Sequence, residues 1–184
     1  AVTNPSVDGT AQFTSATAAV GVELAAGFYT GGLTDKDVLF LSYTPIVTPT
    51  EHMAIWPGKR KFAHFEFDLS LFLHGDKLEG YEFAVPLTLT IEYDPALLSN
   101  LKEDTLVLEF WDGTGWSTDG VTVIARDLAN HILVVSIAHL SEFAFFAESP
   151  TDIDPEPEPD WANHVFMPGV YYEDSRMSNG PAQE

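Results

Sequence analysis

One alternating segment of the sequence carries three side chains that can bind a metal ion. His64, Glu66 and Asp68 are spaced two residues apart, so on a β-strand they share one face. Imidazole nitrogens and carboxylate oxygens both serve as metal ligands. A flat row does not converge on a point, however, and the solvated face of a half-buried strand produces the same spacing. We therefore expect neither a metal site nor any other cofactor in this protein.

Two tryptophans flank a short glycine-rich segment. Trp111 and Trp116 enclose the sequence Asp-Gly-Thr-Gly at 112–115. Aromatic rings beside a carboxylate can stack on sugar rings, so a surface glycan is one candidate ligand. Asp-Gly is also a strong turn signal, and a tight hairpin with one tryptophan in the core is the interpretation that we favour.

Alternating hydrophobic residues identify the elements that position these side chains. From Phe65 to Leu73 and from Phe83 to Tyr93, nearly every second residue is apolar, which is typical of half-buried β-strands. Shorter segments follow the pattern less strictly, at 38–43, 105–111, 121–125, 132–138 and 143–147. Asp-Gly pairs at 112–113 and 119–120 mark turns between them. The sequence therefore predicts an all-β protein, an antiparallel β-sandwich.

Two local features refine this prediction. Pro86 has no amide donor, so inside a strand it indicates an edge position or a β-bulge. The segment DPALLSNL at 94–101 is expected to form a single helical turn.

Composition divides the chain into three regions. Residues 1–19 are small and polar, residues 20–147 carry the strand pattern, and residues 148–184 are acidic and rich in proline. Proline favours an extended backbone. We expect the sandwich to occupy 20–147, with extended N-terminal and C-terminal arms.

Charge and composition argue against several classes of protein. The 28 acidic and 8 basic residues give a net charge of −20, which repels nucleic-acid phosphates and anionic membranes. The absence of cysteine excludes disulfides and thiolate zinc sites. No apolar run approaches the ~18 residues of a membrane-spanning helix, so no transmembrane segment is predicted.

The middle region resembles ZU5-like domains of bacterial surface proteins. The matching segments are VELAAGFYTGGLTDKDVLFLSYTPI at 22–46, PLTLTIEYDPALL at 86–98, LVLEFWDGTGW at 106–116 and VVSIAHLSEFAFFA at 134–147. They occur in the family's order and end on its closing box, here His139-Leu140-Ser141 followed by Phe143 and Ala144. One departure is that Ala25 or Ala26 stands where the family usually has proline before its small-residue turn. The resemblance implies a β-sandwich at the cell surface.

The same resemblance raises the possibility of self-cleavage. Some ZU5-like domains cleave themselves at such a tripeptide, with the hydroxyl of Ser141 attacking the carbonyl of Leu140 and His139 acting as general base. Strain in the turn lowers the barrier, and water then hydrolyses the ester. The alternative is a corner between strands in which both side chains bond to the backbone. We favour the corner and expect no enzyme.

Two further observations suggest an extracellular location. HVFMPGV at 164–170 resembles the YLPLV-type box that closes many secreted proteins of one bacterial phylum, with Met167 and Gly169 in place of leucines. The chain starts at Ala1 rather than Met, which fits a mature protein whose signal peptide has been removed.

The flanking regions suggest contacts between copies of the chain. An extended acidic segment can dock on the only basic cluster of the sequence, and apolar N-terminal residues can anchor a donated strand. The expected contact residues are Val2, Val7 and Phe13, the basic residues Lys59, Arg60 and Lys61, and the aromatic residues Trp161, Phe166, Tyr171 and Tyr172.

We therefore predict an extracellular structural subunit that forms a homo-oligomer or polymer through its arms, in a filament, sheath or surface layer. A cell-surface adhesion or carbohydrate-binding module is the first alternative. A self-cleaving ZU5-like domain is the second.

Overall fold

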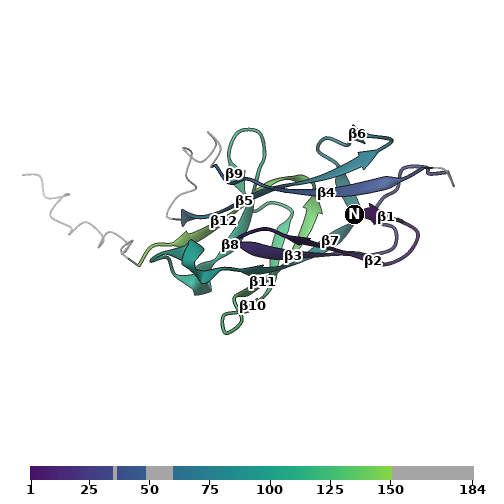
Figure 1. The fold of residues 1–184 in the computed structure, drawn as a ribbon. Helices are drawn as coiled ribbons and strands as arrows, with labels where there is room; N and C mark the ends of the chain where they lie inside the picture. Colours follow the sequence, from purple (N-terminus) through teal and green to yellow (C-terminus); the bar gives the residue numbers. More distant parts are fainter. Residues whose placement is uncertain (35–36, 49–59, 151–184) are drawn as a thin grey trace, which may run out of the picture. The chain divides into compact units, whose positions relative to one another are not determined.

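The structure is a computed structural model, and it describes residues 1–34, 37–48 and 60–150 (Figure 1). These residues form two antiparallel sheets that face each other. Sheet A has the order β1-β4-β5-β12-β8-β9, with β6 paired to β5 alone, and sheet B has the order β10-β11-β7-β3-β2. The predicted antiparallel β-sandwich is therefore confirmed.

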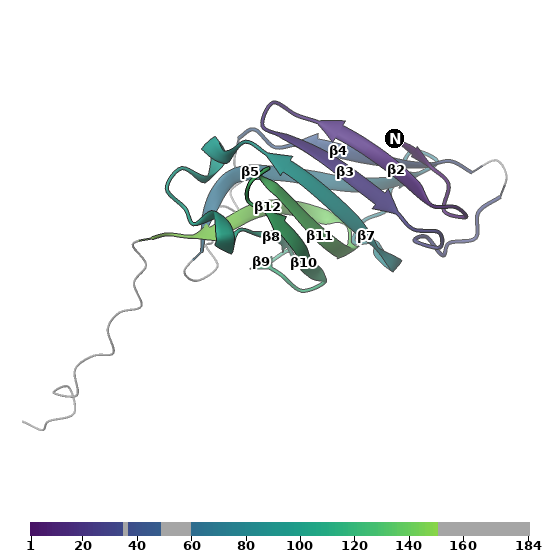
Figure 2. The ribbon, with the colours of Figure 1, turned by 90° about the horizontal axis from the view of Figure 1, so that it is seen from below.

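The strands of sheet A are β1 (Val2–Thr3), β4 (Leu39–Pro45), β5 (Arg60–Leu73), β6 (Asp76–Lys77), β12 (Ser141–Glu148), β8 (Val107–Trp111) and β9 (Trp116–Ser117). The strands of sheet B are β10 (Val121–Asp127), β11 (Ile132–His139), β7 (Glu82–Tyr93), β3 (Ala18–Leu24) and β2 (Gly9–Thr14). Figure 2 shows sheet B from the outside, with β2 and β10 at its opposite edges.

The alternating residues of both sheets meet in one core. In β5, Phe67, Leu69 and Leu71 are completely buried, and in β7 the same is true of Leu89 and Ile91. Burying a side chain of this size stabilises the fold by roughly 1.5–3 kcal/mol. The period of two found in the sequence therefore corresponds to the face that each strand turns toward the other sheet.

The outer face of sheet A differs from the expected solvated surface. Phe62, Trp116, Ala144 and Phe146 are buried there as a second, smaller apolar cluster, with Val107 and Trp111 packed against it. The segment at 143–147 therefore buries both of its faces. This agrees with the position of β12 between β5 and β8 in the middle of its sheet.

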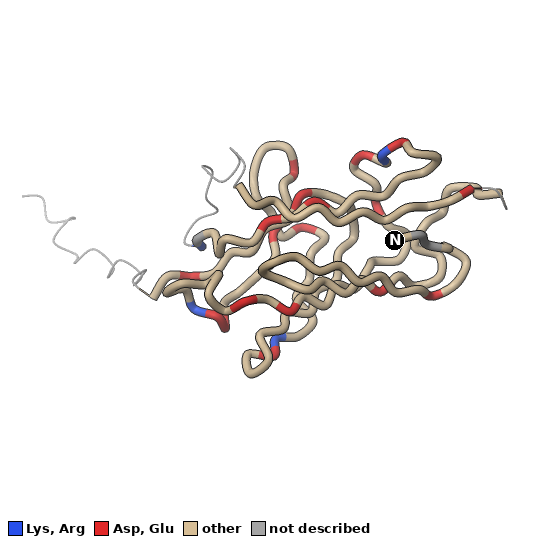
Figure 3. The backbone as a smooth tube through the Cα atoms, in the orientation of Figure 1, with Lys and Arg blue, Asp and Glu red and all other residues tan. Residues whose placement is uncertain are grey.

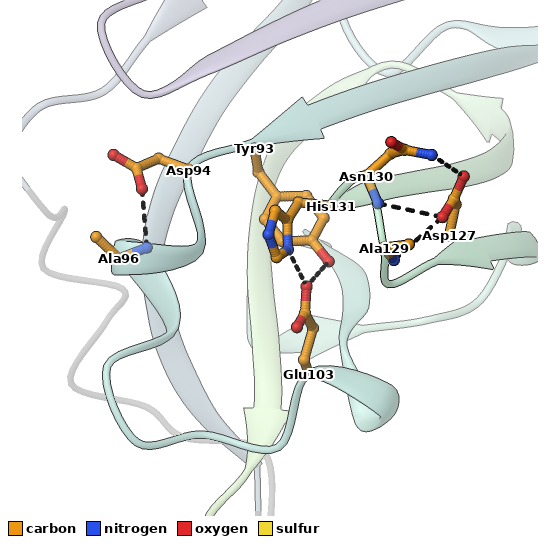
Figure 4. A network of polar contacts seen from close by, with 8 residues as sticks. All are labelled: Tyr93, Asp94, Ala96, Glu103, Asp127, Ala129, Asn130 and His131. Carbon is orange, nitrogen blue, oxygen red and sulfur yellow. Dashed lines mark hydrogen bonds and ion pairs between the residues drawn. The ribbon is translucent and has the colours of Figure 1, made fainter.

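Both local predictions around β7 have structural counterparts. A 3₁₀ helix, η2 (Pro95–Leu98), follows the strand, and its first turn is capped by Asp94, whose carboxylate accepts a hydrogen bond from Ala96 N at 2.9 Å (Figure 4). Pro86 lies in a central strand rather than an edge strand. The pairing of β7 with β11 is irregular at this point, which confirms the bulge interpretation. A second 3₁₀ helix, η3 (Glu103–Thr105), precedes β8.

The N-terminal region is part of the sandwich, which corrects the prediction of a free arm at 1–19. β1 pairs with β4, and β2 pairs with β3 along its whole length. Ala11 is buried in the core, and the ring of Phe13 stacks on that of Tyr43 at 5.5 Å. Because most residues of this region are small, their alternation was too weak to predict a strand from the sequence. The expected C-terminal arm lies outside the described residues beyond Pro150.

Candidate functional site

The His139-Leu140-Ser141 box connects the two sheets. His139 is the last residue of β11 in sheet B, and Ser141 is the first residue of β12 in sheet A. Leu140 between them is buried, and its amide donates to the carbonyl of Tyr81 at 3.0 Å. The box therefore forms a corner at which the chain crosses from one sheet to the other.

The imidazole of His139 is held by the turn that precedes β10. Its Nε2 lies 3.0 Å from the carbonyl oxygen of Asp119. Because a carbonyl only accepts hydrogen bonds, Nε2 carries the proton in this contact. The ring also packs on Phe110 of β8, with 4.0 Å between the ring centroids.

The hydroxyl of Ser141 points to a third strand. Its Oγ donates to the carbonyl of Trp111, at the end of β8, over 2.7 Å. Each polar side chain of the box thus bonds to a main-chain carbonyl of a different element. Among the described residues, those with a positive φ other than glycine are His64, His74, Ser99 and His131, and none of these belongs to the box. These are the contacts of a structural corner, as the favoured alternative expects.

An acidic groove opens beside this corner. It has a volume of 780 Å³ and is lined by the box together with parts of β7, β8 and the turn at 119–120. Six carboxylates line it, those of Asp68, Glu79, Glu82, Asp112, Asp119 and Glu142. Lys77 lies among them and pairs with Asp68 at 3.2 Å. The excess of acids makes the groove unfavourable for anions.

The residues considered for a metal site do not converge. His64 is exposed and has a φ of 53°, whereas Glu66 is only 2% exposed, so the predicted solvated row is interrupted. Asp68 is engaged by Lys77 and by Ser70. Within the described ranges no three His, Asp or Glu side chains lie close enough to hold an ion.

The two tryptophans belong to a hairpin between β8 and β9, as the favoured interpretation predicts. Their rings meet edge to face at 5.7 Å, and Trp116 is buried in the outer cluster of sheet A. Asp112 closes the turn by accepting hydrogen bonds from Thr114 N at 2.7 Å and Gly115 N at 2.8 Å. These bonds hold the pKa of Asp112 below its usual value. The burial of Trp116 removes one of the two rings proposed to stack on a sugar.

Only part of the predicted basic contact lies among the described residues. Lys59, the side chain of Lys61 and the aromatic residues Trp161, Phe166, Tyr171 and Tyr172 lie outside them. Arg60 is described, and its Nη1 donates to Oε1 of Glu109 at 2.5 Å within the same chain. Glu109 is 1% exposed, and its burial raises the pKa of this carboxyl, while Arg60 acts in the opposite direction.

The three N-terminal contact residues take different positions. Val2 lies in β1, and its side chain is outside the described ones. Val7 is exposed between β1 and β2, and Phe13 is half-buried beneath the edge of sheet B. Phe13 therefore packs inside its own sandwich instead of anchoring a donated strand.

The two edges of sheet B differ in how they meet the solvent. At one edge, β10 carries a bulge near Ile124, and Arg126 Nε donates to the carbonyl of Leu106 at 3.0 Å, which ties this edge to sheet A. At the other edge, β2 has the sequence GTAQFT and pairs with β3 without a register shift. No described strand pairs with its outer side. The sequence contained a signal for this edge, namely the alternation of Thr10, Gln12 and Thr14 with apolar neighbours.

The described residues contain no helix of the length and hydrophobicity that a membrane span requires. No protein-family model matches the sequence, and no curated protein matches it either. The ZU5-like resemblance therefore remains a prediction that rests on the segments quoted above.

Proposed function

We propose that this protein is an extracellular structural subunit that assembles with copies of itself. The observation that carries the proposal is the edge of β2, which is regular and uncharged and has no partner strand within the described ranges. The extracellular setting follows from the resemblance to bacterial surface domains. The acidic segment at 148–184 is the expected second contact, which would extend an assembly into a filament, sheath or surface layer.

An open strand edge is a strong site of association. Its outward amide and carbonyl groups are a template for another strand, and monomeric proteins usually blunt such edges with charges, proline or bulges. β10 has a bulge and two charged residues, Arg126 and Asp127, whereas β2 has none of these devices. The contrast within one sheet supports an interaction role for β2.

The distribution of charge also favours this edge. Acidic positions are spread over the described chain and basic positions are few (Figure 3). Copies with a net charge of −20 repel each other, so contact between them requires a surface without acids. The segment Gly9–Thr14 carries no charged residue.

The contacts of the His139-Leu140-Ser141 corner are consistent with a structural protein. The corner fastens β11 and β12 to the turn before β10 and to the end of β8. It thereby stabilises the frame that holds both sheets together.

Sedimentation of the purified chain over a wide range of concentrations tests the proposal, with electron microscopy of the concentrated sample. We expect the mass to rise with concentration above that of a single chain. A second preparation that ends at residue 150 tests the C-terminal contact, and we expect smaller assemblies from it. A constant single-chain mass for the full chain, together with no visible assemblies, would overturn the proposed function.

A further inference from the structure

We propose that β2 pairs antiparallel with β2 of a second copy, around a two-fold axis that passes beside Gln12. The inference rests on the proposed function, because it specifies how two subunits meet. The two five-stranded sheets B would join into one continuous sheet of ten strands.

The hairpin between β2 and β3 determines which main-chain groups point outward. The amide of Ser15 donates to the carbonyl of Ala18 at 2.8 Å. This pair continues the register in which Thr14 is opposite Ala19 and Gly9 is opposite Leu24. In antiparallel strands, pairs that exchange hydrogen bonds alternate with pairs whose amides and carbonyls point away from each other.

Counting back from Ser15 assigns each residue of β2. Gly9, Ala11 and Phe13 bond to β3, so the amides and carbonyls of Thr10, Gln12 and Thr14 point outward. These outward groups form a short, regular ladder with no partner strand among the described residues.

A two-fold axis beside Gln12 matches this ladder with itself. Gln12 lies opposite Gln12 of the second copy, and Thr10 lies opposite Thr14 of the second copy. Every outward group then faces an outward group, and each of these pairs exchanges two main-chain hydrogen bonds. If the register between the two copies were shifted by one residue, the outward amides and carbonyls of one β2 would lie opposite residues whose main-chain groups already bond to β3.

The side chains are compatible with the same arrangement. On the outer face, threonine meets threonine on both sides of the central glutamines, and threonine pairs of this kind are favourable across strands. On the inner face, Ala11 lies opposite Phe13 of the second copy, so a small residue meets a large one. Asp8 lies opposite Ala16 of the second copy, which keeps its charge away from another acid.

Residue Gly21 of β3 supports the outer face of this edge. A Cβ atom at Gly21 would lie 2.9 Å from Nε2 of Gln12, so the glycine provides the space in which the Gln12 side chain lies across β3. The side-chain amide of Gln12 thus lies over β3 rather than over the outer edge of β2.

The symmetry of the outward residues around Gln12 indicates that the partner at this edge is a second copy of the chain. The pattern Thr-Ala-Gln-Phe-Thr presents the same outward residues in both directions from Gln12. It also carries no charge in a chain whose net charge is −20, so it is a part of the surface where two copies do not repel each other.

Single cysteines test the register directly, because the natural chain has no cysteine. In a hydrogen-bonded antiparallel pair the Cα atoms are about 5.5 Å apart, which suits a disulfide. We therefore expect Gln12→Cys to form a disulfide-linked dimer under mild oxidation. In Thr10→Cys the two cysteines would lie four residues apart along the strand, roughly 13 Å, and should not crosslink. Mixing Thr10→Cys with Thr14→Cys should give the mixed dimer. Equal, low crosslinking in all three samples would refute the predicted pairing.

A proline variant provides an independent measurement. The amide of Gln12 points outward in each copy, so Gln12→Pro removes both hydrogen bonds of the central pair of the dimer and none of the sandwich. Gln12→Thr keeps this amide and is the matched control. We expect the proline variant to have the circular dichroism of the natural chain and a dimer dissociation constant at least about tenfold higher, whereas the threonine variant dimerises normally.

The outcomes separate the two proposals. If the natural chain associates and Gln12→Pro associates equally well, the β2 pairing is wrong and the proposed function stands. If the natural chain is monomeric at every concentration, both proposals fail.

Discussion

The hydroxyl of Tyr93, at the end of β7, donates a hydrogen bond to Oε1 of Glu103 over 2.9 Å (Figure 4). The same oxygen lies 2.6 Å from Nδ1 of His131. Glu103 belongs to η3, so one carboxylate connects this short helix to β7 and to the turn before β11. Burial, followed by the hydrogen bond to Glu103 and the charge of that carboxylate, raises the pKa of Tyr93 well above its ordinary value of 10.0.

Replacing Tyr93 by phenylalanine should therefore change the stability of the protein at alkaline pH. The raised pKa means that the unfolded tyrosine ionises first, so its contribution is complete below pH 10 and is lost as the pH rises through the folded value. At neutral pH we expect Tyr93→Phe to lower the free energy of unfolding by about 0.5–1.5 kcal/mol. Above pH 10 the stability of the natural chain should decline more steeply than that of the variant, as measured by urea unfolding. Parallel pH profiles would contradict this account of Tyr93.

Removing Arg60 should destabilise the protein most at neutral pH. Arg60→Ala leaves the buried carboxylate of Glu109 without its cation, which we expect to cost about 1.5–3 kcal/mol. Because burial raises the pKa of Glu109 in the folded state, protonation favours folding, and this contribution is lost as the pH rises through the folded value. The deficit of Arg60→Ala should therefore shrink as the pH is lowered toward 4.5, the ordinary pKa of a glutamate.

Two further variants test the role of Glu109 in this deficit. Glu109→Gln in the Arg60→Ala background should remove the pH dependence of the loss. Lys77→Ala breaks the exposed pair with Asp68 and is the control, with an expected effect of about 0–1 kcal/mol. An equal loss for Arg60→Ala and Lys77→Ala would show that Arg60 contributes only a surface contact.

The glycine beside the corner box should not tolerate a side chain. Gly120 has a φ of 72°, and a Cβ atom there would lie 2.9 Å from Cδ2 of His139. Gly113 has a φ of 96° and no atom within 4 Å of such a Cβ, so Gly113→Ala measures the backbone cost alone. We expect Gly120→Ala to lose about 1–3 kcal/mol and to exceed Gly113→Ala in thermal unfolding. Equal losses would mean that the ring of His139 moves aside freely.

The Leu140–Ser141 bond should remain intact in the purified protein. The hydroxyl of Ser141 donates to the carbonyl of Trp111, and His139 is bonded to Asp119, so neither group is directed at the other. Mass spectrometry should give the full-length mass for the natural chain and for Ser141→Ala. Two fragments that meet at this bond, present in the natural chain and absent in the variant, would support self-cleavage instead.

The strands were predictable where one face is buried and the other solvated. The alternation from Phe83 to Tyr93 identified β7 because Leu87, Leu89, Ile91 and Tyr93 all face the core, although Val85, beside the irregular pairing at Pro86, is exposed. The short strand β2 was missed, since Ala11 is small and only Phe13 marks the inner face clearly. Sequence patterns detect such strands weakly, although β2 pairs with β3 as regularly as β3 pairs with β7.

The site was predictable only in part, because its contacts join distant segments. The box His139-Leu140-Ser141 was identified from the sequence, but its acceptors are carbonyls of Trp111 and Asp119, and every residue type offers a carbonyl. The burial of Glu66 and Glu109 was not predictable from alternation. These residues flank Ala144 on neighbouring strands, and only the pairing of β5, β12 and β8 brings them together.

The place of β12 in sheet A has a consequence for the order of folding. β12 is the last described strand of the chain, yet it lies between β5 and β8, and β8 has no other long neighbour in its sheet. A nascent chain therefore lacks the centre of this sheet until residues 141–148 have been synthesised. For a chain that crosses a membrane unfolded from its N-terminus, sheet A would likewise be completed only after residues 141–148 had crossed.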